Sequence, residues 1–170
     1  MKLRDLASVA EIVGAVAVVV SLIYVGVQVN DSTSAIRSAA ASDATITMQS
    51  WYIEMGSNRQ ASDVWFNAMT SPEPLSARDE FQFMMSMHVA ILGMQNSYLL
   101  SKEGTLDAEF REAVTTAIVA VKDLPGMRRY WTQRRGFFHT GFAEYVDGLL
   151  AQEAIETLDI YKASEVAPDQ

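Results

Sequence analysis

The residues best suited to chemistry lie in one short segment, 127–139, which reads Met-Arg-Arg-Tyr-Trp-Thr-Gln-Arg-Arg-Gly-Phe-Phe-His. Four of the chain's 13 basic residues fall within it, although the whole chain has a net charge of −8. Guanidinium groups gathered in this way can bind a phosphorylated ligand, a lipid headgroup or an acidic partner. On a helix, the tryptophan lies three or four positions from arginines, within reach of cation–π contact. The candidate anion or partner contacts are Arg128, Arg129, Trp131, Arg134 and Arg135.

A structural interpretation of the same segment competes with this one. Trp131, Phe137 and Phe138 would be buried, and the arginines would pair with acids of the same chain, such as Glu144, Asp147 or the acidic C-terminal tail. The chain carries 21 Asp and Glu residues, enough acid to neutralise these arginines internally. Both interpretations stay open at the level of sequence.

Other catalytic groups are few. The imidazoles are His88 and His139, cysteine is absent, and neither Glu-x-x-His nor His-Glu-x-x-His occurs. A Gly-x-Ser-x-Gly elbow and a glycine-rich phosphate loop are also missing. His88 lies on an apolar helical stripe, which favours a hydrogen-bonded core histidine over a ligand or proton shuttle. The sequence therefore predicts no catalysis, no metal and no cofactor, with an unrecognised enzyme as a third hypothesis.

Composition sets the outer limits. The chain has 170 residues, of which 49% are hydrophobic and 20% charged, enough to build one domain with an appendage. Its acidic balance argues against nucleic acid as a partner, because phosphate contacts require a surplus of positive charge.

The first thirty residues are predicted to form a transmembrane anchor. Between Leu6 and Val29 the only charge is Glu11, and as a helix these residues rise about 36 Å, enough to cross a hydrocarbon core of about 30 Å. The main alternative is a cleaved signal peptide, which has a shorter apolar core followed directly by a small-x-small cleavage site. A buried helix of a soluble protein is the remaining alternative. Lys2 and Arg4 precede the span, which slightly favours a periplasmic C-terminal domain in a bacterial inner membrane.

One face of this helix carries small or polar side chains, whereas the opposite face carries valine and isoleucine. Small residues allow another helix to approach closely, so this stripe is predicted to pack on a second copy or on a different membrane protein. Its members are Ala7, Ala10, Gly14, Ala17, Ser21 and Gln28.

The remaining residues are predicted to form an all-α bundle: a stalk or first bundle helix over 31–58, a bundle core over 59–152 and an acidic tail over 153–170. The expected core stripe of the longest bundle helix is Phe81, Met85, His88, Leu92, Gln95 and Leu99. Met84, Met87, Ile91 and Met94 widen that apolar surface. Ser76, Thr105 and Thr140 are the expected N-caps, and a further helix is expected over 127–135.

Two stretches resemble a family of uncharacterised small bacterial single-pass membrane proteins. One is the anchor Glu11-Ile-Val-Gly-Ala-Val-Ala-Val-Val-Val-Ser-Leu-Ile-Tyr-Val25. The other is Pro125-Gly-Met-Arg-Arg-Tyr-Trp131-x3-Arg135-x2-Phe138-x3-Phe142-x2-Tyr145-Val-Asp147. The resemblance covers about a fifth of the chain and implies a single N-terminal span followed by a helical domain, with no activity or cofactor attached.

Together these patterns favour a non-catalytic, membrane-anchored accessory or scaffold subunit. It would contact lipid and pack on a membrane protein partner, or on itself, through the anchor and the aromatic–arginine segment. The alternative is a membrane-tethered binding or sensing domain for an anionic or amphipathic ligand.

Overall fold

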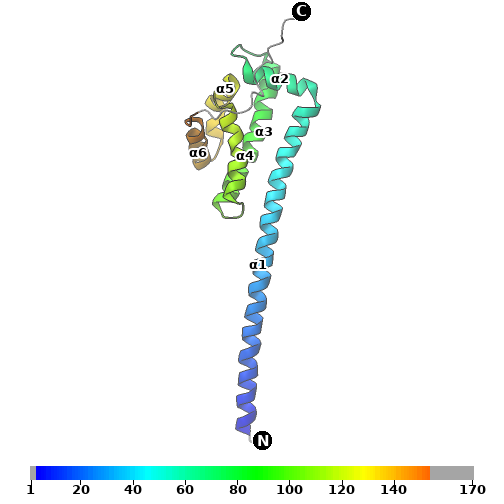
Figure 1. Cartoon of the computed structure of the whole chain (residues 1–170), viewed down its shortest axis with the longest axis vertical. Coiled ribbons are helices and arrows are strands. Elements are labelled where there is room, and N and C mark those ends of the chain that lie inside the picture. The colour runs from blue at the N-terminus through cyan, green and yellow to red at the C-terminus, as the bar shows by residue number, and fades with distance from the viewer. Residues whose placement is uncertain (1–2, 154–170) are drawn as a thin grey trace, which may run out of the picture. The chain divides into compact units, whose positions relative to one another are not determined.

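The computed structural model describes residues 3–153, with side chains from residue 11 onward, and within that range the protein is all-α, as predicted. Figure 1 shows the helices in chain order. They are α1 (Leu3–Ser57), α2 (Arg59–Thr70), α3 (Ala77–Lys102), α4 (Ala108–Val121), α5 (Pro125–Arg134), the 3-10 turn η1 (Arg135–Phe137) and α6 (Thr140–Leu150). The residues of the acidic tail beyond 153 lie outside the described part, as does Lys2.

The chain divides into two compact units within α1, after Ala40. In the first unit, every described side chain from Glu11 to Ala39 is exposed. The most apolar 18-residue window of α1 has a mean hydropathy of 2.4, so this helix is long and apolar enough to cross a membrane. The helix is continuous from the predicted anchor into the predicted stalk, and the Thr33 hydroxyl donates to the Val29 carbonyl at 2.8 Å.

The second unit begins with the last turns of α1, which fold back into α2. Asn58 separates the two helices and caps the second, because its side-chain oxygen accepts from the Ala61 amide at 3.1 Å. Trp51 joins α1 to the bundle: its indole nitrogen donates to the Ser86 carbonyl of α3 at 3.1 Å, and its ring meets Trp65 of α2 edge-on. The C-terminal part of α1 is thus a bundle helix.

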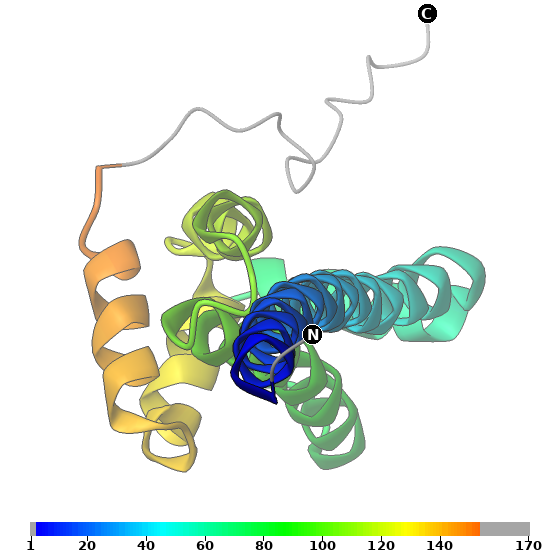
Figure 2. The same ribbon diagram turned by 90° about the horizontal axis from the view of Figure 1, so that it is seen from below.

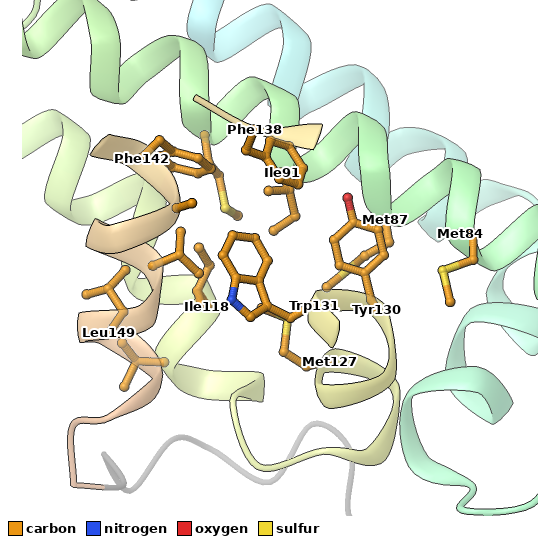
Figure 3. Close-up of a cluster of buried hydrophobic side chains, with 14 of the residues drawn as sticks. Met84, Met87, Ile91, Ile118, Met127, Tyr130, Trp131, Phe138, Phe142 and Leu149 are labelled. Carbon is orange, nitrogen blue, oxygen red and sulfur yellow. The ribbon is translucent and has the colours of Figure 1, made fainter. Parts of the chain in front are cut away.

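Helices α3 to α6 surround one apolar core. Helix α3 packs against α2 and α4, and α6, orange in Figure 2, crosses α4, which is seen end-on in that view. Trp131 of α5 lies in the middle of the buried cluster, among Ile118, Met127, Phe138 and Phe142 (Figure 3). The large buried side chains come from the short helices α5 and α6, which supply Tyr130, Trp131 and Phe142, and from α3, which supplies Phe83 and Tyr98.

The predicted core stripe of α3 is wrong in most of its members. Phe81, Met85 and Leu92 are exposed, and His88 is only half-buried. The buried face consists of Phe83, Met84, Met87, Ala90, Ile91, Met94, Ser97 and Tyr98. Both faces of α3 are apolar, so spacing alone did not decide which one turns inward. Met84, Met87 and Met94 are buried, whereas Met85 points away from them and is exposed.

Helix starts follow local side-chain chemistry. Ser76 caps α3 as predicted, accepting from the Asp79 amide at 3.2 Å. The predicted caps Thr105 and Thr140 are wrong, because Asp107 and His139 cap α4 and α6. Helix α5 starts at Pro125, two residues earlier than predicted, since proline lacks only an amide that a first helical turn leaves unbonded.

Gly126 lets α5 touch the end of α2. A Cβ atom at this position would lie 2.5 Å from the Ala68 carbonyl oxygen and 2.6 Å from Met69 Cα, both backbone atoms. No side chain can occupy that space unless one helix moves, so this glycine fixes the contact between the two helices.

Replacing Gly126 with Ala is therefore expected to lower the free energy of unfolding by about 1–3 kcal/mol, the usual cost of overpacking. The matched control is Gly148→Ala, because Gly148 is exposed within α6 and a Cβ there meets nothing within 4 Å. That control is expected to gain about 0.5–1 kcal/mol from helix propensity. Chemical denaturation monitored by circular dichroism measures both, and equal effects of the two substitutions would contradict the proposed close contact.

Candidate functional site

The small-residue stripe of α1 is exposed to solvent at every position whose side chain the structure describes. Gly14, Ala17, Ser21 and Gln28 are exposed, whereas the side chains of Ala7 and Ala10 lie outside the described part of the structure. Ala17 and Ser21 help to line a shallow depression of about 270 Å³ on the helix surface. Such a depression is the feature that small residues are expected to produce for a packing helix.

Asp147 of α6 gathers the polar groups of the aromatic–arginine segment. Its carboxylate accepts from the Trp131 indole nitrogen at 2.8 Å and from Nε and Nη2 of Arg135 at 2.9 and 2.6 Å. These hydrogen bonds, first from Arg135 and then from Trp131, lower the pKa of the Asp147 carboxyl below its usual value. Arg135 is thereby committed to an internal ion pair, which was one of the two predicted roles.

Two further arginines also have internal acceptors. Arg128 donates to Asp123 at 2.9 Å. Arg129 donates to the Ala68 carbonyl at 2.9 Å, lies 3.3 Å from the Glu80 carboxylate and stacks over the Phe83 ring. Arg129 thus connects α5 with both α2 and α3.

Arg134 differs from these three arginines. No carboxylate of the described residues lies within ion-pair distance of it, and its buried Nε atom has no hydrogen-bond acceptor there. Its guanidinium lies 5.1 Å from the centroid of the Phe137 ring. Phe137, expected to be buried, is 67% exposed, whereas Trp131 and Phe138 are buried and stack on each other.

His88 lies close to Arg134, and both contact the Phe137 ring. A hydrogen bond of 2.8 Å joins its Nδ1 atom to the Tyr130 hydroxyl, and its ring contacts Phe137 and Phe138. Desolvation lowers the pKa of His88 below its ordinary value of 6.5, and the positive charge of Arg134 lowers it further. Burial raises the pKa of Tyr130, so both partners are neutral at physiological pH.

No family model, curated protein or solved structure matches the chain. The contacts give a physical reason for the residues found between Pro125 and Asp147. Pro125 starts α5, Gly126 allows close approach to the backbone of α2, and Trp131 donates to the Asp147 carboxylate. Within the residues that the structure describes, no three His, Asp or Glu side chains gather closely enough to hold a metal ion.

An exposed apolar surface is the feature that sequence analysis missed. We call it the α3 face and define it by Phe81, Met85, Val89 and Leu92. Phe81 is 65% exposed and Val89 is 52% exposed. Next to it on α3, His88 contacts the exposed Phe137 ring, so apolar surface continues toward Arg134. The signal was present in the sequence as the second apolar stripe of α3, but it was assigned to the core.

The lowered pKa of His88 predicts a pH dependence of stability. The unfolded chain binds a proton near pH 6.5, whereas the folded chain resists it, so the free energy of unfolding is largest above pH 6.5 and declines as the pH falls below it. His88→Gln retains a side chain that can bond to Tyr130 and is expected to flatten that decline.

Urea titrations across this pH range measure the effect. The matched control is His139→Asn, which preserves an N-cap and leaves His88 in place, so it should keep the wild-type slope. A His88→Gln protein with the wild-type slope would show that another group controls the transition.

Proposed function

We propose that the chain is a single-pass accessory subunit of a bacterial inner membrane, anchored by the first unit and contacting a partner through the helical bundle. The observation that carries this proposal is the complete exposure of Ile12–Val27, a run without any charge. An apolar helix surface of this size in water is unfavourable at about 25 cal/mol per Å², and lipid removes that penalty.

The form of α1 supports an anchor over a cleaved signal. A signal sequence has an apolar core of about 7–15 residues and ends at a small-residue cleavage site. Here the uncharged run extends from Ile12 to Asn30, which is 19 residues, and it is helical throughout. We take the bundle to lie on the periplasmic side, because Lys2 and Arg4 precede the span and only Arg37 closely follows it.

The α3 face supports a protein partner for the bundle. Contiguous apolar surface on a folded domain commonly marks an interaction site, particularly where a polar rim surrounds it. Phe137 is an aromatic anchor of the type found at the centres of interfaces, and Arg134 supplies a cation that an acidic group of a partner can neutralise. The small-residue stripe of α1 provides a second contact, within the bilayer.

The anchor is tested by replacing Val16 and Val20 with Arg, which places two charges within the apolar run. Each arginine costs roughly 2.5–3.5 kcal/mol at the centre of a span, so we expect the double variant to leave the membrane fraction during alkaline extraction while the wild type stays. The control replaces the same two valines with Leu. Recovery of the wild type as a soluble protein, or as a shortened chain lacking the span by intact mass, would refute the anchor.

The partner surface is tested by Val89→Glu, which adds a charge to the middle of the α3 face. Since Val89 is exposed, the free energy of unfolding should change by less than about 0.5 kcal/mol, whereas binding should weaken at least about tenfold. The control is Gln133→Glu, at an exposed position of α5. Native electrophoresis after extraction in mild detergent measures the size of the complex, and a complex of the same size in both variants would exclude this surface.

A further inference from the structure

A cleft opens into the bundle between the last turns of α1 and helices α2, α3 and α4. Its volume is about 420 Å³, within the range of roughly 300–1,000 Å³ typical of small-molecule sites. The floor is made by core side chains that are themselves almost fully buried, among them Met87, Ile91 and Met127. The indoles of Trp51 and Trp65 line the same cleft, 4.8 Å apart between ring centroids. All of these residues belong to the second unit.

The lining has the chemistry of a hydrocarbon. No charged side chain contributes to it, and the polar side chains are limited to Ser62, the Tyr52 hydroxyl and the two indoles. The Trp51 indole nitrogen is already bonded to the Ser86 carbonyl. A ligand with a charge inside this cleft would therefore lose its hydration without gaining an oppositely charged partner, which is strongly unfavourable. The occupant must be apolar along the part that enters.

Methionine gives the cleft an adaptable wall. Five of the chain's nine methionines line it, namely Met48, Met55, Met87, Met94 and Met127. Methionine side chains are unbranched and flexible, so they can repack around ligands that lack a fixed shape. An apolar occupant with many rotatable bonds fits such a wall better than a rigid ring system does.

The size of the cleft selects a slender occupant. An α-helix about 10 Å wide fills roughly 420 Å³ in a single turn, so the cleft cannot enclose a partner helix along its length. A methylene group occupies about as much space as one water molecule in the liquid, roughly 30 Å³. The cleft of about 420 Å³ therefore holds roughly 14 methylene groups, joined in an extended or bent chain. This is the size of one medium-length aliphatic chain.

We propose that this cleft binds a single aliphatic chain, supplied either by a phospholipid or by a free fatty acid, with the polar headgroup left outside. The proposal goes beyond the accessory role and rests on it only for supply, because a chain anchored in a bilayer has lipid at high local concentration. Binding buries hydrocarbon against the methionines and the paired indoles, which makes Trp51 and Trp65 direct reporters of occupancy.

The experiment uses the full-length protein in phosphatidylcholine nanodiscs and a bromine atom as a contact quencher of indole fluorescence. In one arm the phosphatidylcholine carries brominated chains, and in the other a brominated fatty acid is added to unbrominated discs. Quenching in the first arm assigns the chain to a phospholipid, and quenching in the second assigns it to a free fatty acid. Trp131 lies outside the cleft and contributes the same background throughout.

The blocking variant is Ala120→Phe, which places a ring in the cleft from α4. Displacing only two methylene groups weakens binding about tenfold, so the brominated ligand should be required at a concentration at least about tenfold higher. Ala120→Leu should give a smaller shift in the same direction, and it also serves if the larger side chain prevents folding. The matched control is Ala113→Phe, on the same helix two turns earlier at an exposed position outside the cleft.

Several outcomes would overturn the proposal. These are the absence of quenching in both arms, equal quenching in Ala120→Phe and the wild type, and displacement of the brominated chain by Ala113→Phe alone. Elution of the protein with the discs reports the anchor independently. A chain that enters discs without being quenched therefore refutes the lipid cleft and leaves the proposed anchor intact, whereas a chain that stays outside them refutes the anchor.

Discussion

The carboxylate of Asp147 accepts the side-chain hydrogen bonds that link α6 to α5 and to the 3-10 turn that follows it. Helices α5 and α6 have only 10 and 11 residues, lengths at which an isolated helix is marginal in water. Asp147 joins them by accepting from both Trp131 and Arg135, and this fixes the indole at the centre of the core. Arg129 makes a similar link between helices, because it joins α5 to the Ala68 carbonyl of α2 and to the Glu80 carboxylate of α3.

Internal hydrogen bonds and ion pairs account for most of the arginines in the aromatic–arginine segment. A cluster of arginines in an acidic protein first suggests an external anion, yet three of the four are held by the chain's own oxygens. Only Arg134 is left without such an acceptor among the described residues, beside an exposed phenyl ring. The segment is therefore mainly a structural junction, and its outward-facing part is small and well defined.

The sequence predicts the positions of the helices well, but it predicts less well which face of a helix is buried. Ser76 and Asn58 mark helix boundaries because their side chains act within one turn, and the pairing of Arg135 with Asp147 was foreseeable from charge. The buried face of α3 was not, since both of its faces are apolar and only the packing of α2, α4 and α6 decides between them. Phe137 is exposed because the chain passes through a 3-10 turn, which rotates each residue by about 120° and not by the 100° of an α-helix. The cleft depends on spacing between helices that are distant in sequence, which no local pattern encodes.

The paired indoles of Trp51 and Trp65 have an optical consequence. Their rings meet edge-on with centroids 4.8 Å apart, and they come from opposite arms of the α1–α2 hairpin. Because packing holds both rings in a fixed, asymmetric arrangement, they contribute to the near-ultraviolet circular dichroism, a signal that vanishes when side-chain packing is lost. The near-ultraviolet signal therefore reports the packing of this pair, together with that of the other buried aromatic rings, without any added label.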